Sequence, residues 1–289
     1  MDIDLLENFL ASAHTYAESS KRTYRDVIPR ILDQVEDNAA FTAAEFVRLL
    51  KSSGWGNARQ RVALAAVKKF LTWHYGPQHP ALTARIKREE GRVQRSLDPA
   101  TALKLLASFD TYTPKGARDL AICTLALDTG LRESELCRIQ LADTDLEHRT
   151  LQVIVKGGQW ESAVFGKQTR ANIDRWLHYR RVADGGNHLF THIKTGRGLT
   201  PEGLYMIVHT WGEKIGIELS PHDLRRSMAV MGYLNGASDR ALMDMGRWKS
   251  VAMVKRYTKN AKLSAVRKFL PVDGLLDPQG DTLPPQGEV

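Results

Sequence analysis

The stretch from His222 to Tyr257 holds side chains that together could handle a phosphate group. His222 and Arg225 lie three residues apart just after Ser220-Pro221, a typical helix start, so both side chains lie on one face near the helix terminus. A guanidinium is a planar set of donors that suits phosphate oxygens, and a histidine can move a proton near neutral pH. Such pairs are also common on solvated surfaces, so this one indicates phosphate chemistry only together with other residues.

Tyr257 is the second candidate, and Trp248 lies nine residues before it, after a Gly-Arg turn. A tyrosine hydroxyl is a poor nucleophile, so a catalytic tyrosine needs nearby cations or a base that favour its phenolate. Most tyrosines at such positions are packing residues whose hydroxyl is hydrogen-bonded. The sequence must therefore supply cations close to Tyr257 before this residue predicts a reaction.

Further motifs supply the cations that Tyr257 needs. The order of the motifs along the chain is Arg, then Lys on a β-turn, then His-x-x-Arg, then Trp, then Tyr. This order resembles the signature of the tyrosine recombinases, the family of lambda integrase, Xer and Cre, over most of residues 98–270. The matching motifs are TGLRESEL at 129–136, VIVKGG with Lys156, HDLRRS at 222–227 and MGRWKSVAMVKRY at 245–257.

The resemblance implies a reaction on DNA in which Tyr257 attacks the scissile phosphate, leaving a 3′-phosphotyrosyl link and a free 5′-hydroxyl. Arg132 and Arg225 would hold the non-bridging oxygens, where negative charge builds in the transition state. Lys156 would protonate the 5′-oxygen leaving group, while His222 would assist removal of the proton from Tyr257.

Two more residues complete the site that the resemblance implies. Glu135, one turn after Arg132, would orient the site by hydrogen bonding rather than react. Trp248 stands where many members have a histidine, as in Cre; its indole N–H can donate to a phosphate oxygen but cannot titrate. Acid–base work would then fall more heavily on His222 and Lys156, with Lys167 as a poor substitute for the latter.

No cofactor is expected. Two guanidiniums can supply the charge that other phosphoryl-transfer enzymes draw from Mg²⁺, and the bond energy stays in the protein–DNA link, so neither a metal nor ATP is implied. Cys123 and Cys137 have no Cys or His neighbours at metal-ligand spacing. We expect both to be buried free thiols.

The net charge of +8 is unevenly distributed along the 289 residues. Residues 1–50 carry a net charge of −4, residues 51–95 carry +8, and the last 19 residues hold four acids and no base. A basic block between acidic ends indicates a polyanion partner. Ribosome-like or membrane-surface binding would fit the charge alone equally well.

The first ninety or so residues predict a small helical bundle, because apolar residues recur at three- and four-residue steps after Ser, Thr or Asn caps. The expected helices cover residues 4–17, 19–36, 42–54 and 57–76.

The fourth of these helices has a basic face that we predict to bind DNA, formed by Arg59, Arg61, Lys68 and Lys69. A solvated face is the alternative, and a face that tracks phosphates is favoured only if the rest of the chain handles DNA. The apolar stripe beside it consists of Val62, Leu64, Ala65, Val67 and Leu71.

A polar linker at residues 86–102 places a domain boundary near Val93–Leu97, followed by a helix capped near Asp98. The sequence TLQVIVKGGQWESAVF predicts a β-hairpin around a Gly-Gly turn. The fold class is therefore mainly α (α+β), with a small antiparallel sheet. The helices expected around it cover residues 99–109, 116–128, a segment starting near Arg132, 167–183, 200–216, 221–236 and 238–246.

Three parts follow from these patterns and from the resemblance. Residues 1–94 would form a helical core-binding domain that contacts DNA, residues 95–272 the catalytic domain, and residues 273–289 a mobile acidic tail. The resemblance implies that residues 264–270 dock into a neighbouring protomer. Val266, Phe269 and Leu270 suit that docking, although packing on the same chain would need the same residues.

Other polar and aromatic residues are read as structural. His74, His178 and His209 are expected to be partly buried helix residues, whereas Trp176 and Trp211 belong to the core. No apolar run approaches a membrane span, and the acidic start is unlike a secretory signal, so the expected location is the cytoplasm.

The resulting hypothesis is a site-specific DNA recombinase whose partner is double-stranded DNA. The resemblance implies four protomers on two sites, exchanging strands through a Holliday junction, with accessory proteins compatible with this arrangement. A phage or mobile-element integrase is preferred, and a Xer-type recombinase that resolves chromosome or plasmid dimers is the alternative. A type IB topoisomerase and a non-catalytic DNA-binding regulator remain the readings from other classes.

Overall fold

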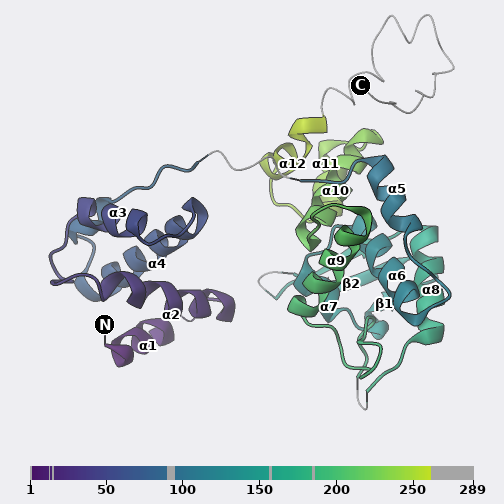
Figure 1. The fold of residues 1–289 in the computed structure, drawn as a ribbon, viewed down its shortest axis with the longest axis horizontal. Coiled ribbons are helices and arrows are strands. Elements are labelled where there is room, and N and C mark those ends of the chain that lie inside the picture. Colours follow the sequence, from purple (N-terminus) through teal and green to yellow (C-terminus); the bar gives the residue numbers. More distant parts are fainter. Residues whose placement is uncertain are drawn as a thin grey trace, which may run out of the picture. The chain divides into compact units, whose positions relative to one another are not determined.

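The computed structural model forms two compact units, Met1–Val93 and Gln94–Val289. The units are shown in Figure 1, and each has its own hydrophobic core. The roles predicted for the two domains stay predictions. The residues that the structure describes are 2–12, 14, 16–89, 95–155, 158–183 and 186–261.

The first unit is helical, as predicted, and aromatic rings fill its centre. The rings of Phe9 and Phe70 meet edge to face with centroids 5.5 Å apart, and α2 packs along α4. Thr42 caps α3 through a capping box with Glu45, in which each side chain accepts a hydrogen bond from the other's backbone N–H. Its elements are α1 (Ile3–Ser12), α2 (Glu18–Leu32), α3 (Ala43–Ser52), α4 (Asn57–Tyr75) and a 3₁₀ turn, η1 (Pro80–Thr83).

Two of the predicted helices of this unit are too long, as is the helix predicted over residues 167–183, which ends at Tyr179. α1 ends at Ser12 rather than at residue 17, and α2 ends at Leu32 rather than at residue 36. After Leu32 the backbone bonds change to the tighter i to i−3 pattern, from Gln34 N–H to the Ile31 carbonyl at 3.2 Å. Such 3₁₀ turns at helix ends are not visible in a hydrophobic pattern.

The predicted apolar stripe of α4 is partly wrong. Val62 is 44% exposed and Ala65 is also exposed, so neither belongs to the core. A helix buries positions at three- and four-residue steps, and the apolar side chains on the neighbouring face satisfy that rule better. The buried residues of α4 are Ala63, Ala66, Val67, Phe70 and Leu71.

The second unit is mainly helical around a three-stranded antiparallel sheet of order β1-β2-β3, which confirms the predicted fold class. Leu151 pairs with Ala163, and both face the core. The elements are α5 (Pro99–Ala107), α6 (Pro114–Thr129), α7 (Glu133–Arg138), η2 (Leu141–Asp143), β1 (Thr144–Asp145), β2 (Thr150–Ile154), β3 (Trp160–Val164), α8 (Lys167–Tyr179), α9 (Pro201–Ile215), α10 (Pro221–Leu234), α11 (Asp239–Gly246), α12 (Val251–Thr258) and η3 (Lys259–Ala261).

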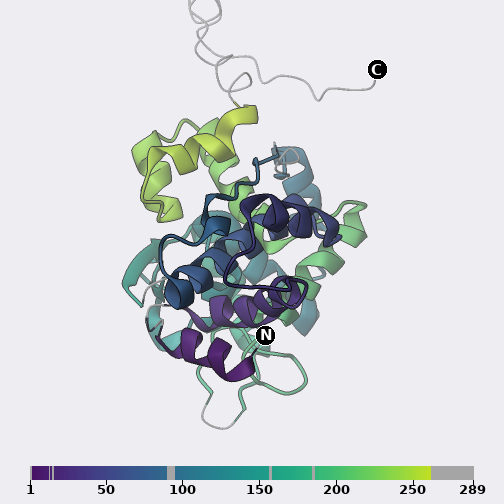
Figure 2. The ribbon, with the colours of Figure 1, turned by 90° about the vertical axis from the view of Figure 1, so that its left-hand side faces the viewer.

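Helix α6 is the centre of this unit, because it packs against both α8 and α10. It ends at Gly130, which takes the left-handed conformation (φ 57°) that glycine adopts without strain. The predicted cap of α5 is confirmed, since the Asp98 carboxylate accepts a hydrogen bond from Thr101 N–H at 2.9 Å. Helices α10, α11 and α12 contact one another and lie together at one end of the unit (Figures 1 and 2).

The two core tryptophans are confirmed as buried, and each indole N–H has a partner. Trp176 donates to the Leu189 carbonyl at 2.8 Å, and Trp211 donates to the Asp119 carboxylate at 3.0 Å. Both polar tips are thus satisfied inside the core.

Both cysteines are buried free thiols, as predicted. Burial raises the pKa of Cys123 and raises the pKa of Cys137 to about 12, so neither forms a thiolate at neutral pH. Of the histidines expected to be partly buried, His209 is half-buried, but His74 and His178 are exposed. Both lie on the outer faces of their helices, where hydropathy alone places no constraint.

Within the described ranges, none of the helices combines the length and apolar character needed to cross a membrane. The same residues contain no group of three or more His, Cys, Asp or Glu side chains that could hold a metal ion.

Candidate active site

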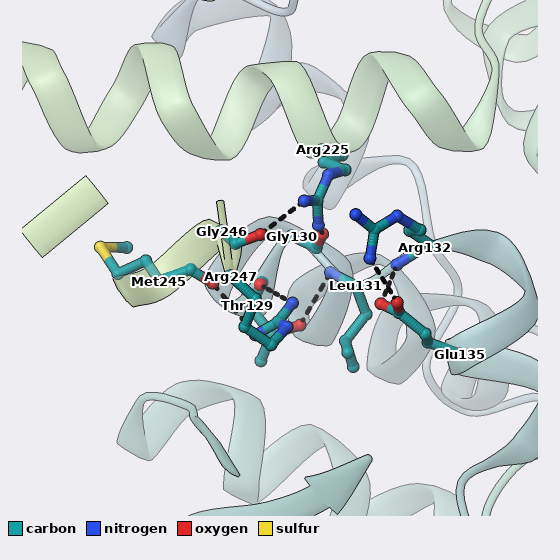
Figure 3. Close-up of polar contacts among 9 residues, drawn as sticks. All are labelled: Thr129, Gly130, Leu131, Arg132, Glu135, Arg225, Met245, Gly246 and Arg247. Carbon is teal, nitrogen blue, oxygen red and sulfur yellow. Dashed lines mark hydrogen bonds and ion pairs between the residues drawn. The ribbon is translucent and has the colours of Figure 1, made fainter. Parts of the chain in front are cut away.

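The structure brings together six of the seven predicted site residues, from segments far apart in the sequence. The turn after α6 carries Arg132, the first half of α10 carries His222 and Arg225, and α12 with the turn before it carries Trp248 and Tyr257. Glu135 lies beside Arg132 (Figure 3). Lys156 lies outside the described residues.

Arg132 is held by Glu135 at the start of α7. Arg132 N–H donates to one carboxylate oxygen of Glu135 at 2.8 Å, and its Nη1 donates to the other at 2.6 Å. The Glu135 side chain is only 3% exposed, whereas that of Arg132 is 40% exposed. A buried carboxylate therefore fixes a guanidinium that still reaches solvent, as expected for an orienting residue.

Arg225 is buried, 2% exposed, and spans two turns of the backbone. Its Nη1 donates to the Gly130 carbonyl and its Nη2 to the Gly246 carbonyl (Figure 3). Burial, with the positive charges of Arg132 and Arg247, lowers the pKa of Arg225 to about 10. The group therefore remains a cation at neutral pH, in a cluster whose positive charge Glu135 offsets only in part.

His222 sits in the first turn of α10, just after Pro221, where Ser220 and Asp223 form a capping box. The ring is open to solvent on one side. The protein on its other side, together with the charges of Arg226 and Arg225, lowers the pKa of His222. The imidazole is therefore neutral at pH 7 and able to accept a proton.

Tyr257 lies between the rings of Trp248 and His222. Its ring centroid is 5.0 Å from that of Trp248 and 6.0 Å from that of His222, the latter pair edge to face. The guanidinium carbon of Arg225 lies 5.0 Å from the Trp248 ring. The half-buried Tyr257 thus contacts the neutral imidazole of His222 and the indole of Trp248, and this indole in turn contacts the guanidinium of Arg225.

The indole N–H of Trp248 is buried and has no hydrogen-bond partner among the described residues. Such a donor costs free energy in the folded protein, and it is rare unless a ligand supplies the acceptor. In contrast, the indoles of Trp176 and Trp211 are both satisfied. The donor beside Arg225 is therefore available for an acceptor that the described residues do not supply.

A cavity of about 310 Å³ opens beside Arg132, His222 and Arg225, and neither Trp248 nor Tyr257 belongs to its lining. Guanidinium groups at its wall suit an oxyanion, and the imidazole at its edge suits proton transfer. The cavity is lined by Leu131, Arg132, Glu133, Ser134, Pro201, Pro221, His222 and Arg225.

Arg247 is absent from the predicted site residues, although it lies in the same cluster. Its Nη2 donates to the Thr129 carbonyl at 2.8 Å and its Nη1 to the Met245 carbonyl at 3.0 Å. The sequence shows only a Gly-Arg turn before Trp248, and an arginine in a turn carries no signal of its own. Its place was not predictable without the fold.

The predicted DNA-binding face of α4 is partly occupied by contacts within the first unit. Arg59 forms an ion pair with Asp26 at 2.7 Å, and its guanidinium lies 4.9 Å from the Trp55 ring. Arg61 is exposed.

The two lysines of this face differ. Lys69 donates to the Tyr24 hydroxyl at 3.2 Å and lies 4.4 Å from the Tyr16 ring, and the bond to Tyr24 raises the pKa of Lys69. Burial, with Arg85 nearby, lowers the pKa of the half-buried Lys68. Their role in binding DNA stays a prediction.

Comparison with known proteins adds an independent finding. The sequence model of the phage integrase family matches residues 95–263. Tyrosine recombinase XerC of Actinobacillus pleuropneumoniae is 30% identical over 183 residues, 62% of this chain and 59% of the relative. Tyrosine recombinase XerA of Pyrococcus horikoshii is 25% identical over 261 residues, 89% of each chain.

Solved structures share the fold. XerH bound to a palindromic difH substrate in a post-cleavage complex matches with a TM-score of 0.72 and 16% identity, over 93% of this chain and 84% of XerH. A lambda integrase dimer bound to a COC′ core site matches with a TM-score of 0.70 and 14% identity, over 88% and 76% of the two chains.

Proposed function

Because this chain belongs to the phage integrase family, as a tyrosine-type site-specific recombinase, we propose that its role is that of a Xer-type enzyme. Such an enzyme resolves dimers of a chromosome or plasmid. Both relatives described above are Xer recombinases, and XerA matches along 89% of both chains. They favour this alternative over the integrase role that was preferred from sequence, since the integrase likeness concerns the fold alone.

The observation that carries the proposed chemistry is the indole N–H of Trp248, which has no partner among the described residues and whose ring lies close to both Arg225 and Tyr257. A phosphate placed where the cavity meets Arg225 would accept from the free donors of Arg132 and Arg225, and also from this indole, which lies beside Arg225 but outside the cavity lining. Three donors around one phosphate stabilise the five-coordinate transition state, because its equatorial oxygens carry more charge than the ground state.

The proposed reaction starts when Tyr257 Oη attacks the phosphorus. A bond forms between Tyr257 Oη and phosphorus, and the bond from phosphorus to the 5′-oxygen breaks. His222, neutral because of its lowered pKa, accepts the phenolic proton directly or through a water. The product is a 3′-phosphotyrosyl link, and the reverse steps join a new 5′-hydroxyl to it.

The 5′-oxygen leaving group needs a proton as the bond breaks. Lys156 is proposed as this general acid on the resemblance alone, because it lies outside the described residues. Trp248 cannot fill the role, since an indole N–H does not titrate in this range.

The proposed partner is double-stranded DNA carrying a specific site, bound by four protomers in the cytoplasm. XerH was solved on its difH substrate, and lambda integrase as a dimer on a core site. Residues 264–270, proposed to dock into a neighbouring protomer, lie outside the described residues, as does the tail at 273–289.

Two other classes make different predictions. A type IB topoisomerase would relax supercoils without site preference and as a monomer. A non-catalytic regulator would bind DNA without forming a covalent bond, and it would leave the constellation around Tyr257 unexplained.

The test is a covalent trap. Duplexes bound by the full-length chain are selected from a random-sequence pool and resynthesised with a nick beside the cleavage position, so that the 5′-hydroxyl fragment diffuses away. The wild type should accumulate a 3′-linked adduct on a denaturing gel, and Tyr257→Phe should not. Tight binding without any adduct would refute the recombinase proposal in favour of the regulator.

A second assay separates the roles. A plasmid multimer with one selected site per unit should be converted to monomers by a Xer-type enzyme. Joining only of two unlike sites would support the integrase, and relaxation of plasmids that lack a site would support the topoisomerase.

A further inference from the structure

Helix α11 ends in an unusual way. Its C-cap residue, Arg247, takes the left-handed conformation with φ 51°, which disfavours every residue with a Cβ and is usually given to glycine. Within the described residues, Arg149 is the other non-glycine residue with positive φ. A residue other than glycine at such a strained backbone position indicates that its side chain has a functional role.

The Arg247 side chain runs back to the turn after α6. It donates to the Thr129 carbonyl at 2.8 Å, while Arg225 donates to the next carbonyl, that of Gly130. At the end of α11, Arg247 donates to the Met245 carbonyl at 3.0 Å, and Arg225 donates to the following carbonyl, that of Gly246. Figure 3 shows these bonds together.

The two arginines therefore join the same two backbone turns, each through one pair of carbonyls. These carbonyls belong to the C-terminal ends of α6 and α11, where the last carbonyls of a helix lack partners within the helix. A cation there is also favoured by the helix dipole. Both guanidiniums thus satisfy the ends of two helices at once.

The joined turns carry the reacting groups. Arg132 follows Gly130 by two residues, whereas Trp248 follows Arg247 directly and leads into α12, which bears Tyr257. If the turn after α11 moved relative to the turn after α6, Tyr257 would move relative to Arg132, which holds the phosphate. Misplacement by about 1 Å can cost on the order of 100-fold in rate.

We propose that Arg247 is a positioning residue for strand cleavage, which holds the segment bearing Trp248 and Tyr257 in register with the turn bearing Arg132. This rests on the proposed function of Tyr257 as nucleophile. Arg247 acts through the Thr129 carbonyl and makes no contact with DNA.

Charges around Arg247 support this role. Burial lowers the pKa of Arg247, while Glu135 and Glu161 raise it and Arg132 lowers it further. Glu135, which holds Arg132, thus also favours the charged form of Arg247. The Nε of Arg247 is buried and has no partner within the part of the chain that is described, which leaves direct contact with a phosphate as the competing explanation.

The experiment uses the full-length chain and the selected nicked duplex at saturating concentration. Arg247→Gly relieves the left-handed backbone and removes the contacts, and Arg247→Lys keeps the charge and one donor. Arg240→Ala is the matched control, because Arg240 lies on the same helix, is 80% exposed and pairs with Asp244. The rate of covalent-complex formation and the equilibrium affinity for DNA are both measured.

We expect Arg247→Gly to form the complex about 10- to 100-fold more slowly with DNA affinity within about twofold of the wild type, and Arg247→Lys to recover part of the rate. Arg240→Ala should react as the wild type. Wild-type rates in both Arg247 variants would overturn the proposal. If Arg247→Gly fails to fold, as seen by lost DNA binding, the test rests on Arg247→Lys. This variant must then form the covalent complex more slowly than the wild type at equal DNA affinity.

The salt dependence of binding separates positioning from direct contact. A phosphate contact contributes about one unit to the slope of log affinity against log salt. An unchanged slope in Arg247→Gly is expected, and a slope smaller by about one would overturn the positioning role. If the wild type itself forms no adduct, the proposed function fails, which is a different result from equal rates in wild type and variant.

Discussion

Trp248→Phe tests the phosphate site most directly, because the substitution keeps an aromatic ring and removes only one donor. The indole N–H has no partner among the described residues of the free protein, so its loss should matter only when DNA supplies an acceptor. A hydrogen bond to a charged group contributes about 1.5–3 kcal/mol. At 1.36 kcal/mol per tenfold, cleavage should slow by about 10- to 150-fold.

The stability of the free protein should change little. Trp248 is 5% exposed, and the smaller ring loses packing of about 1–2 kcal/mol, by the value of roughly 0.8 kcal/mol per buried methylene. Removal of an unsatisfied buried donor returns about 1–3 kcal/mol. The two effects offset, and we expect a change within about 1 kcal/mol of the wild type.

Trp176→Phe is the matched control. The indole of Trp176 donates to the Leu189 carbonyl at 2.8 Å in the core, so its removal leaves an acceptor unsatisfied as well as a smaller ring. This variant should lose about 2–5 kcal/mol of stability yet cleave DNA at the wild-type rate while folded.

Single-turnover formation of the covalent complex at saturating DNA measures the rate, and urea unfolding measures the stability. Cleavage by Trp248→Phe at the wild-type rate, or a rate that falls only as much as the folded fraction, would exclude the indole as a donor to the phosphate. A loss confined to DNA affinity would mean that the indole bonds equally to the ground and transition states.

Three more outcomes are expected. The wild-type cleavage rate should be flat around pH 7 and fall with an acidic midpoint below 6.5, because only neutral His222 accepts the proton and its pKa is lowered; a midpoint at or above 6.5 contradicts this. Lys156→Ala should slow cleavage of ordinary DNA far more than of a 5′-thiol-leaving substrate, and equal slowing would remove Lys156 as the general acid. Lys68→Ala with Lys69→Ala should flatten the salt dependence of DNA binding, whereas an unchanged slope would exclude this face of α4 from the interface.

Sequence patterns predicted most helices of the fold because their signals are local. Asp98 before Pro99 marks the start of α5, and Ser220 before Pro221 marks the start of α10. The hairpin was equally visible from its alternating β-branched residues. In α4, however, Val62 is apolar but exposed, because which face meets the core depends on the packing of α2 and not on α4 alone.

The site was predictable as a set of residues but not as a geometry. The nine-residue step from Trp248 to Tyr257 does not reveal that the centroids of their rings lie 5.0 Å apart. Nor does the sequence show that Arg225 uses two nitrogens on backbone carbonyls, or that Arg247 shares this task. The bonds from Arg225 to Gly130 and from Arg247 to Thr129 join residues 95 and 118 positions apart, and only tertiary structure creates them.

The mutual repulsion of Arg225, Arg132 and Arg247 has a practical consequence for handling the protein. Among the described residues the carboxylate of Glu135 offsets only part of this positive charge, so small oxyanions in solution should compete with DNA for the site. By mass action, sulfate or phosphate that binds only the folded chain raises its melting temperature as the logarithm of the anion concentration. Activity and stability measured in phosphate and in chloride buffers therefore describe two different thermodynamic states of the same enzyme.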